Sequence, residues 1–302
     1  MAKFPDPLAR ALDWLRTSPP DTARPVLLAG PTASGKSALA LALARHQGRV
    51  IVNADALQVY DMWRVLSARP DAADCAQVPH YLYGMVTRDQ DWSVGHWLRA
   101  VEGLLARHGN PVIVGGTGLY FRALTEGLVE IPPVPPQVRA EADARLAAEG
   151  VGALLQELDP RTRAQIDTQN PARVQRAWEV LHATGTGLAD WQARTPPPLL
   201  PVPQATALVL RPQVEWLNAR IDSRFASMMA QGALEEARAV LPHWQPRAPW
   251  AKAIGAPELI AHLQGHISLP QTHQAATLAT RQYAKRQRTW FRNRMKDWII
   301  LS

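Results

Sequence analysis

The stretch VLLAGPTASGKSALALALAR, residues 26–45, decides the fold of this chain. Residues 26–29 form a short apolar run that predicts a buried strand, and residues 36–45 have the pattern of a helix. Between them, Gly30–Ser37 reads GPTASGKS and satisfies the pattern G-x-x-x-x-G-K-[ST] in full. A strand, a glycine-rich turn and a helix in this order form the first half of a βαβ unit, so the stretch predicts a phosphate-binding loop.

The residue types of this loop suit an anion. Gly30 and Gly35 allow the backbone to turn so that its N–H groups converge on a phosphate, and the following helix offers its positive N-terminal end. Lys36 adds a positive charge, and the hydroxyl of Ser37 can bind Mg²⁺. The pattern alone does not say which phosphate compound is bound, and ATP or GTP is the usual occupant.

Alternating strands and helices continue after the loop and predict an α/β fold with a parallel sheet. Residues 50–53 and 111–114 are further short apolar runs, and residues 94–107 between them have a helical pattern. Asp55 follows the first of these runs, and Gly115–Thr117 follows the second. Ligands of such sheets bind at the carboxyl ends of the strands, so we expect both segments beside the phosphate loop. On the residues alone, Asp55 is equally well interpreted as a helix N-cap.

The middle of the chain predicts a separate helical domain. Residues 131–136 (IPPVPP) and 195–203 (TPPPLLPVP) are proline-rich, and residues 137–192 between them have helical patterns only. A strand-like run at residues 207–210 then returns to the pattern of the first part. We therefore expect an insertion rather than an ordinary second domain in series. The expected division is a core of residues 1–127 and 205–302 that holds a helical insertion of residues 128–204.

The composition favours a partner that carries negative charge. The 302 residues have a formal net charge of +7 and a sequence pI of about 10. Such a balance favours nucleic acids, phosphates or anionic membrane surfaces, although a solvated surface with spare arginines explains it as well. Cys75 is the only cysteine, so no internal disulfide can form and a reducing compartment fits. No apolar run approaches the ~20 residues that span a bilayer, and the N-terminus lacks a signal-peptide core. We therefore expect a cytoplasmic protein without a membrane partner.

The C-terminal region predicts a long basic helix. Residues 272–296 have one continuous helical pattern, and a last strand is expected at residues 298–301. Seven basic residues and no acidic residue lie between positions 281 and 296. Four of the basic residues recur on one face of the helix: Arg281, Lys285, Arg288 and Arg292. Aromatic residues interleave with them: Tyr283, Trp290 and Phe291. Such a face suits the phosphates and unstacked bases of RNA, and the alternative is a solvated face.

Together these segments resemble one family, the tRNA dimethylallyltransferases or IPP transferases. The resemblance covers roughly residues 24–296 in the family's motif order, and it is specific because several independent motifs coincide. The segments that carry it are GPTASGKS (30–37), ADALQVY (54–60), VPHYLYG (78–84), VGGTGLYFRAL (114–124), NPARVQRAWEVLHATG (170–185), RIDSRFASMMAQGALEEAR (220–238) and TRQYAKRQRTWFRN (280–293).

The resemblance implies a P-loop NTPase-like parallel sheet core with an inserted all-helical domain. It also implies an activity, the transfer of the dimethylallyl group of dimethylallyl diphosphate to N6 of adenosine 37 in tRNA, with release of diphosphate. Substitution at an allylic carbon needs neutralisation of charge on the leaving group and a base near the attacking amine. Mg²⁺ is the expected cofactor, the anticodon stem-loop is the expected partner, and a monomer is the simplest expectation for the assembly.

The resemblance also assigns roles to residues. Asp55 matches the general base, Thr117 matches a threonine near the bridging oxygen, and Arg224 matches an arginine that faces the diphosphate. Arg220 is the less favoured choice for that arginine, and Ser37 is the expected Mg²⁺ ligand. The expected diphosphate-binding residues are Gly30, Thr32, Ala33, Ser34, Gly35, Lys36 and Ser37. The expected tRNA-binding residues are Asp55, Ala56, Leu57, Gln58, Ala172, Arg173, Val174, Gln175, Arg176, Arg281, Lys285 and Arg288.

Three departures from the family pattern and three rival functions stay open at this point. Ala56 replaces the usual serine, SARP at residues 67–70 replaces the usual TAKP, and Ala256-Pro257 replaces an aromatic residue and a lysine. The rivals are a small-molecule P-loop kinase, an adenylate isopentenyltransferase and an RNA-binding protein without catalysis. No carboxylate directly follows residues 111–114, which weakens the kinase because an NTPase usually places an acid there. The basic tail and the helical insertion argue against a free nucleotide as the acceptor.

Overall fold

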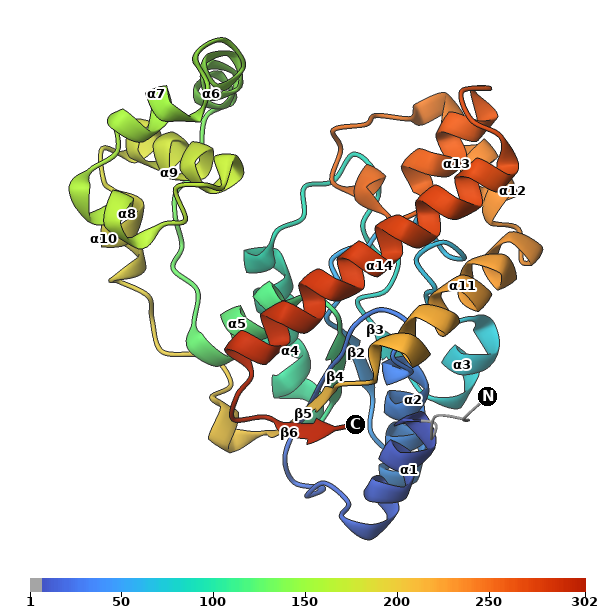
Figure 1. Cartoon of the computed structure of the whole chain (residues 1–302). Helices are drawn as coiled ribbons and strands as arrows, with labels where there is room; N and C mark the ends of the chain where they lie inside the picture. The colour runs from blue at the N-terminus through green and yellow to red at the C-terminus, as the bar shows by residue number, and fades with distance from the viewer. Residues whose placement is uncertain (1–6) are drawn as a thin grey trace. The chain divides into compact units, whose positions relative to one another are not determined.

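The computed structural model of the chain describes residues 7–302. The chain divides into two compact units. The first unit runs to Thr125 and resumes at Leu200, and the second unit is Glu126–Leu199. Figure 1 shows a sheet with surrounding helices in the first unit and helices alone in the second. In the described part of the chain, no helix combines the length and the apolar composition needed to cross a membrane.

Six parallel strands form the centre of the first unit. In spatial order they are β3 (His80–Tyr81), β2 (Ile51–Asn53), β4 (Val112–Gly115), β1 (Val26–Ala29), β5 (Thr206–Leu210) and β6 (Ile299–Leu301). Every residue of β1, β2 and β4 is buried, as expected for parallel strands with both faces covered. The predicted α/β fold with a parallel sheet is confirmed. The sequence does not predict β3, because two half-buried residues are too few to show a period.

The helices of the first unit precede and follow the second unit in sequence. Those that precede it are α1 (Pro7–Thr17), α2 (Lys36–Gln47), α3 (Ala72–Gln77), α4 (Val94–His108) and α5 (Gly118–Glu126). Those that follow it are α11 (Val214–Ala230), α12 (Ala233–Val240), α13 (Ala256–Leu263) and α14 (Leu269–Arg294), with 3-10 turns at Val202–Gln204, Leu241–His243 and Trp250–Lys252. α1 and α2 pack Leu15, Leu39 and Leu43 against the strands. α11 to α14 share a second apolar core with residues 59–66.

The second unit is a group of helices with an apolar core of its own. Its helices are α6 (Pro136–Glu149), α7 (Val151–Gln156), α8 (Pro160–Gln165), α9 (Pro171–Thr184) and α10 (Leu188–Gln192). Val174, Ala177 and Trp178 of α9 pack with Ala142 of α6 and Leu154 of α7. Because this core closes within the unit, residues 126–199 have the burial that a separate domain needs.

Helix α14 has 26 residues and a well-defined start. The hydroxyl of Ser268 accepts a hydrogen bond from the N–H of Gln271, and the side chain of Gln271 accepts one from the N–H of Ser268. This reciprocal capping box satisfies two N–H groups that the first helical turn leaves without partners. Farther along, Ala284 and Phe291 are buried against the first unit, and Gln287 is a polar residue buried on the same helix.

A buried arginine holds together the segments that lead into the sheet. Arg49 lies two residues before the start of β2 and is only 2% exposed. Its Nη1 donates to the carbonyl oxygens of Arg24 at 2.7 Å and Asn110 at 2.8 Å, and its Nη2 donates to that of Asp21 at 2.7 Å. Burial lowers the pKa of Arg49, and the charge of Asp21 opposes this shift. One guanidinium therefore fixes the chain ahead of β1, β2 and β4.

We expect Arg49→Met to lower the free energy of unfolding by about 3 kcal/mol, because the substitution leaves buried carbonyl oxygens without their charged donor. Arg45→Met, at an exposed position of α2, is the matched control and should change stability by less than about 0.5 kcal/mol. Urea unfolding followed by tryptophan fluorescence measures both variants. Equal midpoints for the two would show that the buried hydrogen bonds of Arg49 contribute nothing specific.

Candidate active site

The loop between β1 and α2 directs its backbone toward the N-terminal end of α2. Ala33 and Gly35 have positive φ values, 63° and 90°, in the left-handed region that favours small residues and glycine. Gly30 leaves no room for a side chain, because a Cβ there would lie 2.8 Å from the Oγ of Ser34. α2 has no side-chain N-cap, and the first N–H groups of a helix lack partners within the helix. These N–H groups and the positive end of α2 form a site for an anion.

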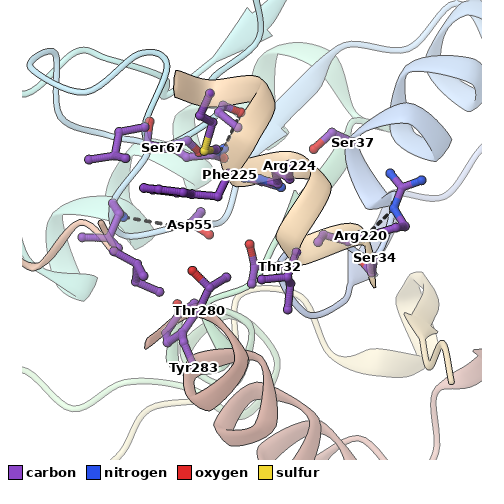
Figure 2. A pocket seen from close by; sticks show the side chains of 18 of the residues that line it. Thr32, Ser34, Ser37, Asp55, Ser67, Arg220, Arg224, Phe225, Thr280 and Tyr283 are labelled. Carbon is purple, nitrogen blue, oxygen red and sulfur yellow. Dashed lines mark hydrogen bonds between the residues drawn. The ribbon is translucent and has the colours of Figure 1, made fainter. Parts of the chain in front are cut away.

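The loop opens onto a cavity of about 300 Å³, shown in Figure 2. The residues that line it come from the loop and the start of α2 (32–38), the segment after β2 (55, 57 and 58), the loop at 66–68, α11 (220–228), residues 253–254 and α14 (280–283). Because β1 and β2 are parallel, the loops that follow them leave the sheet at the same edge. The structure therefore brings the phosphate loop, Asp55 and Arg224 to one cavity.

Three charged groups influence one another around this cavity. Burial lowers the pKa of the Lys36 ammonium to about 8, while the nearby Asp55 carboxylate raises it and Arg224 lowers it. Burial also lowers the pKa of Arg224, and Asp55 opposes that shift. A guanidinium stays charged in proteins even so. Two cations against one carboxylate leave an excess of positive charge, which suits a multiply charged anion.

Arg220 lies one turn before Arg224 on α11 and contacts the loop itself. Its Nε donates to the carbonyl oxygen of Ala33 at 3.0 Å, and its guanidinium lies 4.7 Å from the centre of the Trp216 ring. In Figure 2, Arg220 extends along the loop, whereas Arg224 points into the cavity. The geometry favours Arg224 as the residue that faces a bound anion, and it gives Arg220 a role in holding the loop.

Asp55 closes a turn and also faces the cavity. Its Oδ1 accepts a hydrogen bond from the N–H of Leu57 at 3.0 Å, and its own N–H donates to the Oδ1 of Asn53 at 2.9 Å. The residues directly after Asp55 form turns and not a helix, so the alternative of a helix N-cap is wrong. The Oδ2 of Asp55 lies toward Gly116, where a Cβ would be 3.3 Å away. One carboxylate oxygen thus fixes the turn and leaves the other for a ligand.

Thr117 lies beside the Asp55 turn but not in the cavity wall. Its Oγ1 accepts a hydrogen bond from the N–H of Ala56 at 2.9 Å, and its N–H donates to the carbonyl oxygen of Ala54 at 3.2 Å. This close approach of the two loops depends on Gly115, because a Cβ there would lie 2.0 Å from the same carbonyl oxygen. The hydroxyl proton of Thr117 can still be donated to a ligand.

α14 contributes to the site through a face that the sequence analysis missed. Thr280 and Tyr283 line the cavity, Gln287 is buried, and the ring of Trp290 covers Gly118 so closely that a Cβ there would lie 2.4 Å from it. Positions 280, 283, 287 and 290 follow the spacing of one helix face. Burial and the charge of Asp55 raise the pKa of Tyr283. In the sequence, the sign of this second face is that the four residues recur at helical spacing between the basic residues of the same helix.

The basic residues predicted to bind RNA lie on another face of α14. Three of them are exposed or half-buried: Arg281, Lys285 and Arg288. Arg281 forms an ion pair with Asp222 of α11, at 2.5 Å. Phe291 is buried in the core, Tyr283 lines the cavity, and the ring of Trp290 covers Gly118. The expectation that aromatic side chains interleave on the basic face is therefore wrong, because the sequence pattern does not show that these rings have partners inside the fold.

In the second unit, α9 carries the predicted RNA contacts at residues 172–176. Three of these residues are exposed: Ala172, Arg173 and Arg176. Val174 is buried in the core of the unit, and Gln175 donates a hydrogen bond to Asp143 at 2.7 Å. The side chain of Val174 is therefore closed to RNA, which corrects that part of the prediction. The helix turns Val174 inward because one face of α9 must bury its apolar residues.

The cavity wall also has an apolar part, of which only Leu57 was among the predicted site residues. Its members are Leu57, Leu66, Ile221, Phe225, Met228 and Ile254. Ile221, Phe225 and Met228 share one face of α11, but the other three come from segments far apart in sequence, so no single local pattern joins all six. The loop that supplies Leu66 also carries Ser67 and Ala68, whose carbonyl oxygens each accept a hydrogen bond from the Nε2 of Gln58 at 2.9 Å. Gln58, predicted as an RNA contact, thus uses its amide N–H groups to hold this loop.

Glu236 of α12 fixes the same loop from the other side. Its carboxylate accepts hydrogen bonds from the N–H groups of Arg64 at 2.5 Å, Val65 at 3.0 Å and Leu66 at 2.9 Å. The hydroxyl of Ser67 donates to the carbonyl oxygen of Trp63 within the loop. A single carboxylate therefore positions the backbone that supplies part of the apolar wall.

The site offers few protein ligands for a metal ion. Within residues 7–302, no group of three or more His, Cys, Asp or Glu side chains is placed to bind one. The hard oxygen donors of the cavity include the hydroxyl of Ser37, at the start of α2, and the carboxylate of Asp55. This set fits Mg²⁺, which commonly binds one or two protein oxygens together with substrate phosphates and several waters.

The sequence is similar to known transferases over most of its length. Residues 58–294 match the family described as IPP transferase, and residues 24–83 match the one described as isopentenyl transferase. The tRNA dimethylallyltransferase of Cereibacter sphaeroides strain KD131 is 68% identical over 275 residues, which cover 91% of this chain and 88% of that protein. That of Dinoroseobacter shibae is 63% identical over 279 residues, which cover 91% of this chain and 93% of that protein.

Solved structures share the fold. The tRNA isopentenylpyrophosphate transferase of Bacillus halodurans is 28% identical with a TM-score of 0.65, and the match covers 92% of this chain and 90% of that one. A eukaryotic dimethylallyltransferase, described as acting on tRNA, has a TM-score of 0.75 at 22% identity, and the match covers 91% of this chain and 73% of that one. The second likeness concerns the fold alone. Together they confirm the predicted P-loop NTPase-like core.

We expect Glu236→Gln to loosen the loop at residues 64–68, because an amide NH₂ replaces one acceptor and faces backbone N–H groups. Hydrogen exchange of the amides of residues 64–66 should become at least about tenfold faster, which corresponds to a loss of about 1.4 kcal/mol. Glu235→Gln, at the neighbouring exposed position of α12, is the matched control and should leave this exchange unchanged. Indistinguishable exchange in the two variants would contradict the assigned role of Glu236.

Proposed function

This chain belongs to the IPP transferase family, that of the tRNA dimethylallyltransferases, and from that premise we propose how its cavity transfers a prenyl group to tRNA. The reaction moves the dimethylallyl group of dimethylallyl diphosphate to N6 of adenosine 37. The bond between C1 of the donor and its bridging oxygen breaks, and a bond between C1 and N6 forms. The amine loses one proton, and diphosphate leaves with the electron pair of the broken bond.

The phosphate loop and its neighbours hold the diphosphate of the donor. Lys36 and Arg224 supply positive charge where the leaving group gains negative charge. The free N–H groups at the start of α2 bind the phosphate oxygens. Ser37 would hold Mg²⁺, which would neutralise further charge on the diphosphate. Of the predicted loop residues, Thr32 contributes its side chain, because its N–H already donates to Gln287.

Asp55 is the base of the proposed reaction. Its Oδ2 faces away from the turn that Oδ1 closes, so it can accept the proton that N6 releases. Thr117 donates its hydroxyl proton toward the bridging oxygen of the donor and is held by the N–H of Ala56. The donor of this hydrogen bond is the backbone N–H of residue 56, so the replacement of the family's serine by Ala56 leaves the bond intact.

The dimethylallyl chain occupies the apolar part of the cavity, beside Phe225 and Met228 of α11 and Leu66. This single cavity, lined by a phosphate loop, an acid and an apolar wall, is the observation that carries the proposal. A phosphoryl acceptor of a kinase does not need the apolar wall. The wall suits a short hydrocarbon, whose burial is favourable by roughly 0.8 kcal/mol per methylene group.

The acceptor is the anticodon stem-loop of a tRNA. An unpaired base in a loop can be flipped out at modest cost to reach a buried donor. The segment Asp55–Gln58 meets this base at the cavity, and the phosphate backbone binds basic residues elsewhere: Arg281, Lys285 and Arg288 of α14 and Arg173 and Arg176 of α9. The second unit, residues 126–199, is the proposed tRNA-contacting insertion. A tRNA substrate favours the cytoplasm as the working compartment, and a monomer suffices for this reaction.

We expect Asp55→Asn to lower kcat by about 100- to 10,000-fold, the usual contribution of a general base, with little change in tRNA affinity. The measurement is transfer of label from dimethylallyl diphosphate, with Mg²⁺, to tRNA or to AMP. Asp61→Asn, a nearby exposed position, is the control and should keep the kcat of the unaltered chain. A normal kcat for Asp55→Asn would overturn the base assignment. Label that enters AMP and never tRNA would overturn the proposed acceptor.

We expect the affinity for dimethylallyl diphosphate to fall as the pH rises above about 8. The pKa of Lys36 is lowered to about 8, so its ammonium loses its proton there in the free site and no longer attracts the anion. Calorimetric titration without tRNA and at fixed Mg²⁺ should give a Kd roughly 10- to 30-fold higher at pH 9.5 than at pH 7.5. The phosphate itself ionises near pH 6, below this window. The Kd of the Lys36→Arg variant for dimethylallyl diphosphate should not rise over this pH range, because arginine stays charged. An equal rise of Kd in the variant and the unaltered chain would contradict the proposed role of the Lys36 ammonium.

A further inference from the structure

Gln287 of α14 is a buried amide that joins two loops of the active site. Its Oε1 accepts a hydrogen bond from the N–H of Thr32 at 2.8 Å, and its Nε2 donates to the carbonyl oxygen of Gly116 at 2.9 Å. The residue is only 5% exposed. Thr32 belongs to the phosphate loop after β1, and Gly116 immediately precedes Thr117 in the loop after β4. One side chain therefore bridges the loop that binds the leaving group and the loop that carries Thr117.

Gly116 leaves space for this amide because it has no side chain. A Cβ at Gly116 would lie 2.3 Å from the Nε2 of Gln287 and 3.3 Å from the Oδ2 of Asp55. The peptide unit between Gly116 and Thr117 is held on both sides, because its carbonyl oxygen accepts from Gln287 and its N–H donates to Ala54 at 3.2 Å. The direction in which the Thr117 side chain leaves the backbone is thus fixed beside Asp55.

Gln287 also decides which part of the phosphate loop meets the donor. The N–H of Thr32 points to Gln287 and away from the anion, so the free N–H groups begin farther along the loop. Burying an amide is unfavourable unless its polar atoms are bonded, and here one atom donates and the other accepts. An apolar residue of similar length fills the same space without that cost. The amide is therefore suited to directing the two loops rather than to packing alone.

We propose that Gln287 is a positioning residue of the transfer reaction, which sets the distance between the diphosphate loop and the pair formed by Thr117 and Asp55. This inference rests on the proposed function of the cavity. The bridging oxygen, C1 and N6 must lie in line for the substitution, and small errors in such alignment reduce rate strongly. Gln287 is buried and is not among the residues that line the cavity, so its loss should act on kcat more than on KM.

The test is Gln287→Glu, which keeps the length and the acceptor but loses the donated hydrogen bond while the carboxyl is ionised. At pH 8.5 we expect kcat to fall at least about 100-fold, with a KM for the donor within about threefold of that of the unaltered chain. On lowering the pH to 6 the carboxyl gains a proton, which can donate to Gly116 again. The neighbouring titratable groups are Asp55, whose negative charge favours this protonation, Lys36 and Arg224, whose positive charges oppose it, and Tyr283, which stays neutral because its pKa is raised. The ratio of variant kcat to unaltered kcat should therefore rise at least about tenfold between pH 8.5 and 6.

Two variants separate positioning from packing and from overall charge. Gln287→Met has a similar length but neither hydrogen bond, so its kcat ratio should be low at every pH. Gln282→Glu adds the same charge at an exposed position of α14 and should keep the kcat of the unaltered chain. If kcat falls equally in Gln287→Glu and Gln287→Met and the loss does not change with pH, Gln287 only packs. If the kcat of Gln287→Glu stays within threefold of that of the unaltered chain, the bridge is dispensable. Either outcome overturns the inference.

If Gln287→Glu does not fold, Gly116→Ala tests the same bridge from the other side, because its methyl group displaces the Gln287 amide. Its kcat should fall at least about 100-fold while circular dichroism and donor affinity stay unchanged, and a normal kcat would count against the bridge. Failure of the proposed function has a different signature, since the unaltered chain would then transfer no label to tRNA. Normal transfer by the unaltered chain together with an active Gln287→Glu variant rejects the positioning role alone.

Discussion

The backbone of β4 passes β2 so closely at Gly115 that a single methyl group there would lie 2.0 Å from the carbonyl oxygen of Ala54. Hydrogen bonds hold this contact in place: the N–H of Ala54 donates to Val114 at 2.8 Å, that of Thr117 donates to Ala54, and that of Gly30 donates to Gly115 at 3.3 Å. The loops after β1, β2 and β4 all begin at this point. The backbone of the sheet edge therefore sets the relative positions of the phosphate loop, Asp55 and Thr117 before any side chain contributes.

The side chains around this edge adapt a common loop to a particular reaction. A phosphate loop on a parallel sheet occurs in proteins with many activities, so the fold does not decide the chemistry. Here α11 supplies both Arg224, which faces the anion, and Phe225 and Met228, which form the apolar wall. The low pKa of Lys36 reflects the burial of its ammonium group at this cavity. One helix thus gives the cavity a charged part for a leaving group and an apolar part for a hydrocarbon.

α14 serves two different surfaces because a helix presents several faces at once. Its basic residues lie on the outside, where a phosphate backbone can approach, and its inward face carries Tyr283, Gln287 and Trp290. The glycines of the segment after β4 make this possible, since Gly116 accommodates the Gln287 amide and Gly118 accommodates the Trp290 ring. In the sequence these glycines only mark the end of a strand, whereas in the structure side chains of α14 occupy the space beside Gly116 and Gly118.

The sequence by itself determined the parallel α/β core, because most of its strands are short apolar runs, most of its helices have a helical period, and the phosphate loop has a local pattern. It also placed Asp55 and the loop together, since residues that follow parallel strands must share one edge of the sheet. Only the tertiary structure decided what packs across that edge. The apolar wall combines α11 with several other segments, and Val174 turns inward because it packs in the core of its own unit. Gln287 bridges Gly116 and Thr32, which precede it in the sequence by 171 and 255 positions. Such contacts depend on how helices and strands pack in space, so no local sequence pattern predicts them.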